Sequence, residues 1–334
     1  MMRSMSSRAG LIAALGLAST LLAPVAAQAA DGVYSVWLVE NSRFMNVPFG
    51  AFQPDRAYVP SAPAGGPNGV NTVDLPVNVG VIKGAGKEII LYDNGWNQTE
   101  YHKATGTDHW SPLSKQLGQL GINAADVTKV IVGHGHWDHA GSLDEFPNAV
   151  LYIQREELKG IEWALNYPGH ERIRAVNDSP GGCARTPACG YPSKTMDSIY
   201  GKVLKGKAVI VDGDMEVQPG IKIHAAFRAH TAGSQLLEVN TPIGKLMFGS
   251  DAYSSWEGIR DWQIANPQQT DTVQQFLAYE KCYKVTGGYQ NCVAAHEPLS
   301  YTDKYPLTKN AWVGMNGGRL AEITLAPGEK SRKP

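Results

Sequence analysis

The chain has 334 residues, which is long enough to bury a sizeable core and even to form two domains. Hydrophobic residues make up 43% of it and charged residues 18%, an ordinary balance for a globular protein. The formal net charge is only −1, so the composition favours neither nucleic acid nor an acidic polymer nor a membrane surface as the main partner.

The first residues have the pattern of an export signal. Arg3 and Arg8 give a positive start, and Leu11–Ala27 is a run of apolar and small residues that leads into an Ala-Gln-Ala cleavage sequence. We therefore expect residues 1–29 to be a signal peptide and the mature protein to be periplasmic or secreted. A retained membrane anchor is the alternative, but Pro24 and the alanines disfavour it, so no stable membrane insertion is expected after cleavage.

Strand and loop signals open the mature chain. We expect a strand at Val33–Glu40, then a hairpin of Val77–Ile82 and Glu88–Tyr92 around a Gly-Ala-Gly turn. Between them, Asn41–Asn71 is rich in Pro and Gly, and we interpret it as a loop near the mouth of an active site. Three phenylalanines there either form an apolar wall or anchor the loop to the core: Phe44, Phe49 and Phe52.

Four potential metal ligands lie within six residues after the next strand. That strand begins at Val127 and is rich in β-branched residues, and the ligands that follow are His134, His136, Asp138 and His139. In an extended loop, His134 and His136 project to the same side, whereas the adjacent Asp138 and His139 must point apart. This spacing suits two neighbouring ions better than one closed tetrahedron. Metal-free surface histidines are the weaker interpretation, because three clustered imidazoles are hard to keep neutral and paired.

Short strands and helices fill the rest of the chain. Helical spacing or apolar runs predict helices at Ser111–Leu120, Arg155–Leu165 and Gln268–Thr286, and strands at Val150–Ile153, Ala208–Val211 and Ile221–Phe227. Three further ligand-type residues each follow an apolar strand: His230, Asp251 and His296. Strand ends can present such groups rigidly, so together with the first cluster they complete a set of seven ligands. The histidines without this context are expected to be structural or loop residues: His102, His109, His170 and His224.

Four cysteines in an exported protein suggest disulfides, and three pairings are possible. We favour the two local pairings. Cys183–Cys189 would close a loop within an insertion at about 167–207, and Cys282–Cys292 would tie a helix to the strand that follows it. No cysteine lies beside the histidine cluster, so thiolate ligation of a metal is not expected.

The HxHxDH pattern from His134 to His139 resembles the signature of the metallo-β-lactamase superfamily. The RAHTAGS sequence around His230 is similar to that superfamily's GHTxGS element, with Ala229 in place of the usual Gly and Ala232 in place of a frequent Pro. The passage LYIQREELKGIEWA resembles N-acyl-homoserine-lactone lactonases. The resemblance implies an α/β fold, an αββα sandwich of two mixed β-sheets flanked by helices, as a single hydrolase domain at 30–334.

The resemblance also implies two bound divalent metal ions. It divides the ligands into two groups with one bridge: His134, His136 and His230 for one ion, Asp138, His139 and His296 for the other, and Asp251 between them. Zn²⁺ is the first choice for these imidazole and carboxylate ligands, although Mn²⁺, Fe²⁺ or Co²⁺ can use the same set. Asp93 would support the metal-binding loops from behind.

The activity that the resemblance implies is hydrolysis by a hydroxide that bridges the two metal ions. Asp138, Asp251 and Tyr253 are the candidate catalytic residues. Lactonases often carry a Tyr three residues after the bridging Asp, whereas Tyr253 follows Asp251 by two, so Tyr253 is either a pocket-wall residue or a packing residue. Because true metallo-β-lactamases generally lack that Asp, we expect a lactonase that acts on a small-molecule ester or lactone. A phosphotriesterase-like or aryl-ester hydrolase is the alternative, ahead of a β-lactamase or a non-catalytic metal-binding module.

Overall fold

A computed structural model of the chain describes the greater part of the mature sequence. The described residues are 32–48, 72–86, 88–97, 107–169, 188, 190–253, 255–264, 271–302, 304–308, 313–315 and 319–332. The expected signal peptide, Phe49, Phe52, His102, His170 and the Cys183–Cys189 pair lie outside them. Contacts group Asp31–Pro334 into one compact unit.

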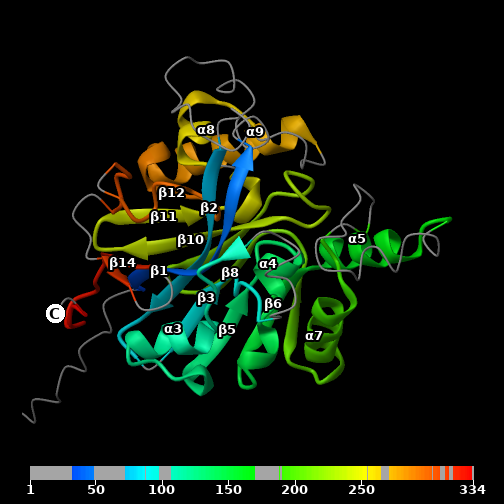
Figure 1. Cartoon of the computed structure of the whole chain (residues 1–334), viewed down its shortest axis with the longest axis horizontal. Coiled ribbons are helices and arrows are strands. Elements are labelled where there is room, and N and C mark those ends of the chain that lie inside the picture. The colour runs from blue at the N-terminus through cyan, green and yellow to red at the C-terminus, as the bar shows by residue number, and fades with distance from the viewer. Residues whose placement is uncertain are drawn as a thin grey trace, which may run out of the picture. The chain divides into compact units, whose positions relative to one another are not determined.

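Two mixed β-sheets form the framework of the described residues (Figure 1). The first sheet has nine strands in the order β13-β14-β1-β2-β3-β5-β6-β7, with β4 paired to β1. Its strands are β1 (Ser35–Pro48), β2 (Thr72–Lys83), β3 (Ile89–Tyr92), β4 (Thr107–Asp108), β5 (Val127–Ile131), β6 (Val150–Gln154), β7 (Ala208–Val211), β13 (Val313–Met315) and β14 (Arg319–Thr324). The pairings from β3 to β7 are parallel and the others are antiparallel.

The second sheet has five described strands in the order β12-β11-β10-β9-β8. They are β8 (Met215–Gln218), β9 (Ile221–Ala225), β10 (Gln235–Thr241), β11 (Gly244–Phe248) and β12 (Cys292–Val293). The described α-helices are α3 (Leu113–Gln119), α4 (Trp137–Ala140), α5 (Arg155–Asn166), α7 (Ser193–Leu204), α8 (Trp256–Asp261) and α9 (Thr272–Thr286). Short 3₁₀ helices are η3 (Ala124–Asp126), η4 (Leu143–Glu145), η6 (Ser250–Ala252) and η7 (Tyr289–Asn291).

Alternating side chains divide the hydrophobic core into three layers, as strand geometry requires. On β1, Val36 and Leu38 face the second sheet and pack with its Ile223 and Leu237. The other face of the first sheet packs against α3, α5 and α7, and the far face of the second sheet packs against α8 and α9. Figure 1 shows α8 and α9 beside β11 and β12, and α3 and α7 beside β5 and β6. The layers are therefore helix, sheet, sheet and helix, which confirms the predicted αββα sandwich.

One sequence prediction of local structure is wrong. The sequence predicts a loop from Asn41, but β1 continues through Pro48 and pairs with β2. Register shifts between Glu40 and Ser42 and between Phe44 and Val47 interrupt the two-residue alternation, which hides the strand. The predicted insertion at about 167–207 contains α7, whose buried Ile199 and Met196 join the core.

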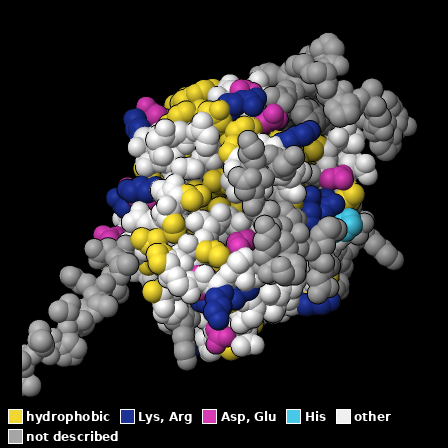
Figure 2. Space-filling view, turned by 90° about the vertical axis from the view of Figure 1, so that its left-hand side faces the viewer, with side chains coloured by type: hydrophobic (Ala, Val, Ile, Leu, Met, Phe, Trp, Pro, Cys, Tyr) yellow, Lys and Arg dark blue, Asp and Glu magenta, His cyan; other side chains and the backbone are white. Residues whose placement is uncertain are grey.

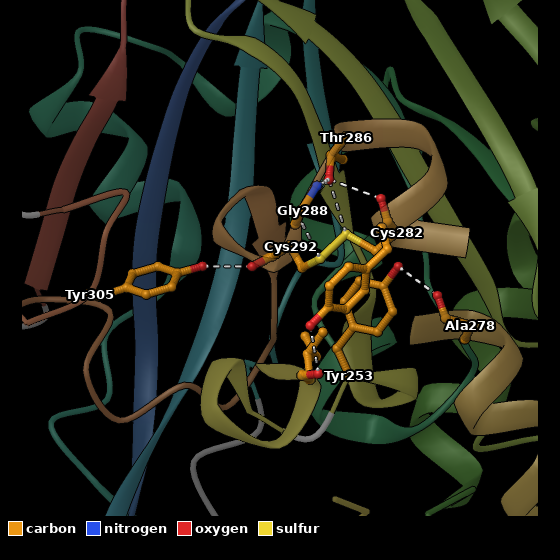
Figure 3. The surroundings of a disulfide bond; sticks show 9 residues. Tyr253, Ala278, Cys282, Thr286, Gly288, Cys292 and Tyr305 are labelled. Carbon is orange, nitrogen blue, oxygen red and sulfur yellow. Dashed lines mark hydrogen bonds between the residues drawn. A yellow bond between two sulfur atoms is a disulfide. The ribbon is translucent and has the colours of Figure 1, made fainter. Parts of the chain in front are cut away.

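A disulfide joins Cys282 of α9 to Cys292 at the start of β12, which confirms one of the two predicted pairings (Figure 3). Both sulfur-bearing residues are fully buried, and their Cα atoms lie 6.1 Å apart. The bridge fixes the end of α9 against the strand that leads towards His296.

The described surface carries mixed charge. On the face shown in Figure 2, Lys and Arg side chains alternate with Asp and Glu, and hydrophobic side chains lie between them. This mixture agrees with a net charge near zero. Among the described residues, none of the helices combines the length and the hydropathy needed to cross a bilayer.

Candidate metal centre

The structure brings all seven predicted ligands to one end of the two sheets. His134 and His136 lie in the loop between β5 and α4, and α4 itself carries two more ligands. The other three follow strands of the second sheet: His230 between β9 and β10, Asp251 in η6 and His296 after β12. Their ligand atoms form two groups in which all atoms lie within 4.8 Å of one another: His134, His136, His230 and Asp251, and Asp138, His139 and His296.

Asp251 lies between the two sets of histidines. Its Oδ2 is 3.3 Å from His230 Nε2 and 3.9 Å from His134 Nε2. Its Oδ1 is 3.2 Å from the Nε2 atoms of both His139 and His296. Each carboxylate oxygen therefore faces a different set, here named the His230 group (His134, His136 and His230) and the His296 group (Asp138, His139 and His296).

Within each group the donor atoms converge. In the His230 group, His136 Nδ1 lies 3.2 Å from His230 Nε2. In the His296 group, Asp138 Oδ2 lies 3.4 Å from the Nε2 atoms of both His139 and His296. Imidazole nitrogens and carboxylate oxygens are the donors that Zn²⁺ and similar divalent ions use in proteins.

The pKa values of the histidines shift in opposite directions in the two groups. Burial lowers the pKa of His136 and of His230 to about 4, and it holds the pKa of His134 well below its usual value. These imidazoles are therefore neutral at neutral pH, which is the form that binds a metal.

In the His296 group the carboxylates outweigh burial. Burial alone would lower the pKa of His296, but Asp251 and Asp138 raise it to about 10, and the same carboxylates with Asp93 raise the pKa of His139. For Asp138 and Asp251, burial raises the pKa, yet the neighbouring histidines hold it well below the usual value. A divalent cation can take the place of the imidazolium protons that these carboxylates attract.

The hydrogen bonding of three buried metal-ligand atoms indicates whether a metal ion fits the site. His134 Nε2, His139 Nε2 and Asp251 Oδ1 are buried and make no hydrogen bond of good geometry in the part of the chain that the structure describes, although His139 Nε2 and Asp251 Oδ1 lie 3.2 Å apart. Buried polar atoms are normally satisfied, and leaving one unpaired costs about 1–3 kcal/mol. Because all three point at the converging ligand atoms, cations among them would satisfy each one, so the donor set fits divalent ions.

Asp93 and Ser250 hold the ligand rings from behind. Asp93 Oδ2 lies 3.0 Å from His139 Nδ1, and its Oδ1 accepts a 2.6 Å hydrogen bond from the backbone N–H of Gly133. This confirms the supporting contact predicted for Asp93. The sequence analysis missed Ser250, whose Oγ lies 3.1 Å from both His134 Nδ1 and His139 Nδ1.

The close approach of Ser250 depends on Gly133. A Cβ at Gly133 would collide with the Ser250 side chain, so this position of the loop has no room for any side chain. A backbone group holds the ring of His296 in the same way: its Nδ1 lies 2.8 Å from the backbone oxygen of Pro76 in β2. These contacts leave the other ring nitrogens of His134, His139 and His296, their Nε2 atoms, directed at the site.

Glu157 in the first turn of α5 is a second residue that the sequence analysis missed. Its carboxylate is fully buried and accepts hydrogen bonds from the backbone N–H groups of Gly135 and Gly233, which lie in two different ligand loops. The available signal was an acidic residue just after β6, at the same edge of the sheet as the ligand loop after β5.

Aromatic side chains line one side of the His296 group. The ring of Phe44 lies 5.7 Å from that of His296, 5.9 Å from Trp137 and 6.0 Å from Trp96, measured between ring centroids. Phe44 and Trp137 are only partly buried, whereas Trp96 is fully buried. Of the two roles left open for Phe44, its contacts with His296 and Trp137 favour an apolar wall, and the residue lies in a strand rather than in the expected loop.

Tyr253 does not join the cluster of ligands. It is fully buried, its hydroxyl donates to the backbone oxygen of Ala278 at 3.3 Å, and its ring lies 6.0 Å from that of Tyr279 (Figure 3). Both partners belong to α9. Of the two roles left open by the sequence, these contacts favour packing.

A two-sheet sandwich with histidine and aspartate ligands at its end defines a class of metal-binding hydrolase folds. The family model described as the metallo-beta-lactamase superfamily matches residues 72–281, and the chain belongs to that superfamily. Its members bind divalent metals, typically zinc, and hydrolyse their substrates.

Relatives of known name match shorter stretches. The chain is 37% identical over 79 residues to the N-acyl homoserine lactonase AttM of Agrobacterium fabrum, a match that covers 22% of this chain and 30% of that protein. It is 36% identical over 58 residues to the metallo-hydrolase mfmC of Annulohypoxylon moriforme, covering 17% of this chain and 15% of that protein. The chain therefore matches less than a third of the length of either relative.

Solved structures confirm the fold over a longer range. A probable metal-dependent hydrolase from Staphylococcus aureus has a TM-score of 0.60 at 18% identity, covering 80% of this chain and 90% of that one. A B. thuringiensis AiiA mutant with N-decanoyl-L-homoserine at its active site has a TM-score of 0.53 at 20% identity, covering 80% and 94%. The hydrolase AbOPH has a TM-score of 0.57 at 18% identity, covering 90% and 97%.

Proposed function

We propose that the protein is an exported hydrolase that binds two divalent metal ions, most suitably Zn²⁺, and opens a lactone. The position of Asp251 is the main support, because its two carboxylate oxygens face two separate groups of ligands. A single closed metal site does not require that arrangement, whereas a carboxylate shared by two ions does. The ligands are the seven residues assigned above: His134, His136, Asp138, His139, His230, Asp251 and His296.

The residues of the chain have distinct tasks in this proposal. Two bound divalent ions would activate a water molecule and polarise the oxygen of the substrate carbonyl. Asp251 fixes the spacing of the two groups, and the neutral His136 and His230 present their lone pairs to the site. We assign to the Asp138 carboxylate the proton that leaves the attacking water, taken on the oxygen that would not bind an ion. Asp138 returns it to the alkoxide as the ring C–O bond breaks, so the products are an alcohol and a carboxylic acid, which ionises by releasing the second proton of the water to solvent.

Lactones are the substrate class we propose, for two reasons. The relative AttM is named as a lactonase of N-acyl homoserine lactones. The rings of Phe44 and Trp137 beside His296 offer an apolar surface to a substrate that carries a hydrocarbon part. Selection must come from the shape of such a surface, because the same water chemistry serves carbonyl and phosphoryl centres.

A competition panel with the zinc-loaded mature protein tests the proposal. It contains acyl-homoserine lactones, simple γ- and δ-lactones, an aryl ester, a phosphotriester and a penicillin. We expect the highest kcat/KM for a lactone. If the aryl ester or the phosphotriester exceeds every lactone by more than about tenfold, equivalent to about 1.4 kcal/mol in transition-state binding, the alternative hydrolase class replaces ours.

A further inference from the structure

Glu157 is a buried carboxylate that the proposed chemistry does not use. Its side chain is 0% exposed and accepts four hydrogen bonds. Oε1 accepts from the backbone N–H of Gly135 at 2.8 Å and from the hydroxyl of Tyr191 at 3.1 Å. Oε2 accepts from the hydroxyl of Thr231 at 2.7 Å and from the backbone N–H of Gly233 at 2.8 Å. One carboxylate thus joins three segments that are distant in sequence.

All four donors belong to the surroundings of the His230 group. Gly135 separates His134 from His136, and Thr231 directly follows His230. The ring of Tyr191 lies 4.9 Å from that of His136. Among the hydrogen bonds of the described residues, the rings of His139 and His296 are held by other groups: Asp93, Ser250 and the oxygen of Pro76. Glu157 therefore contacts one half of the ligand set and not the other.

The geometry requires a carboxylate at this position. A carboxylate has two acceptor oxygens, whereas an amide has one acceptor oxygen and a nitrogen that only donates. In a Gln at position 157, the amide nitrogen would face the N–H of either Gly135 or Gly233, and neither backbone group can turn to accept. The neighbours cannot withdraw easily, because a Cβ at Gly233 would collide with the backbone of Glu157.

We propose that Glu157 is a positioning residue that sets the metal affinity of the His230 group while leaving that of the His296 group largely untouched. The proposal rests on the two-ion site proposed above. Glu157 fixes the loop of His134 and His136 at a set distance from the loop of His230, so the three nitrogens stay close enough for one ion. Residues that orient metal ligands in this way typically change metal affinity by about 10–100-fold when they are replaced.

The test compares Glu157→Gln with Glu40→Gln, a matched control whose carboxylate binds arginines and not the loops of the His230 group. Glu40 is also 0% exposed, and it accepts hydrogen bonds from Arg43 and Arg319. Both variants and the wild type are loaded with zinc, and transfer of the metal to a chromophoric chelator is followed. We expect two bound ions in the wild type, one of them held about 10–100-fold more weakly in Glu157→Gln. In Glu40→Gln both ions should keep their affinities, although the protein is less stable.

Repeating the measurement in two ligand variants shows which group of ligands holds the weakened ion. In His296→Ala, where the His230 group alone remains intact, Glu157→Gln should still weaken zinc binding. In His230→Ala it should have no further effect. Equal weakening of both ions, or no weakening of either, would overturn the positioning role. A wild type that binds no second ion would instead refute the proposed two-ion function.

Milder variants cover the case in which Glu157→Gln does not fold. Thr231→Val and Tyr191→Phe each remove one hydroxyl donor, and Thr231→Ser keeps it. We expect Thr231→Val to weaken one ion and Thr231→Ser to restore wild-type affinity. If Thr231→Val and Thr231→Ser bind zinc equally, the hydrogen bonds to Glu157 do not set the affinity and the proposal fails.

Discussion

Asp251 directs one carboxylate oxygen at each group of histidines, at 3.2 Å on one oxygen and 3.3 Å on the other. In Asp251→Ala, neither ion would have the shared ligand, and the mutual repulsion of two cations would no longer be offset. We expect elemental analysis to find about one zinc ion or fewer where the wild type holds about two, and kcat/KM to fall by more than about 100-fold. Asp212→Ala, at a side chain that is 72% exposed, is the control and should change neither quantity. Full zinc content with near-normal turnover in Asp251→Ala would show that Asp251 is not a bridge.

Removal of the Tyr253 hydroxyl distinguishes a role in packing from a role in catalysis. Its hydroxyl donates to the backbone of Ala278, and its ring lies among the residues that α9 covers. Tyr253→Phe should therefore lower the free energy of unfolding by about 0.5–1.5 kcal/mol, as measured by urea denaturation, and leave kcat unchanged. A loss of about 100-fold or more in kcat with unchanged stability would instead place the hydroxyl at the substrate.

At the scale of elements, the sequence predicts best where a short-range pattern determines the structure. The hairpin of β2 and β3, the helices α5 and α9, and the ligand loop after β5 all carry their own turn, helix or ligand signals. The second half of β1 was not predictable, because bulges break its alternation. Three candidate ligands were expected at strand ends, yet Asp251 lies in η6 and His296 beyond a two-residue strand, since tertiary contacts decide where short strands stop.

The supporting residues were harder to predict than the ligands. An acidic residue in the first turn of a helix, such as Glu157, is ordinarily explained by the helix dipole. Its role depends on loops near Gly135 and Gly233 that approach it only in the folded protein. Ser250 likewise follows a strand in sequence like many other serines, and its contacts exist only because Gly133 leaves room for it.

The pairing of β1 with β14 depends on a buried ionic network. Both oxygens of Glu40 accept hydrogen bonds from Arg43 of the same strand and from Arg319 of β14, at 2.7–3.0 Å. Burial alone would raise the pKa of Glu40, but the hydrogen bonds from Arg319 and Arg43 outweigh it and lower the pKa. Because the folded pKa lies below the unfolded value of 4.5, this stabilisation is complete above about pH 4.5 and is lost as the pH falls through the folded pKa.

Glu40→Gln should therefore destabilise the protein in a pH-dependent way. At pH 7 we expect a loss of about 3–5 kcal/mol in the free energy of unfolding, because the variant leaves two arginines without their buried partner. As the pH falls from the unfolded pKa through the lower folded pKa, the wild type loses this stabilisation, so the difference between the two proteins should shrink. Urea denaturation at neutral and acidic pH measures both values. A difference that stays constant with pH would mean that the charge of Glu40 contributes nothing.

At the scale of the whole molecule, the metal centre joins the two sheets. The ligands from His134 to His139 follow β5 of the first sheet, whereas His230, Asp251 and His296 follow strands of the second. Ions held by both sets would oppose separation of the sheets, and they would satisfy the buried ligand atoms that make no hydrogen bond of good geometry among the described residues. Metal binding should therefore contribute to the global stability of the fold, besides the catalytic role proposed above.

Removal of the metal should accordingly lower the thermal midpoint of unfolding. A ligand present at about 100 times its dissociation constant stabilises the folded state by about 2.7 kcal/mol per site. For a chain of this size, one site then corresponds to a change of roughly 4 °C in Tm. Calorimetry before and after chelation should show this decrease, and zinc should restore the original value. The variant with both His134→Ala and His139→Ala, which removes one imidazole from each group, should show no response to the chelator. If chelation leaves the Tm of the wild type unchanged although it removes the zinc, the ions do not hold the two sheets together.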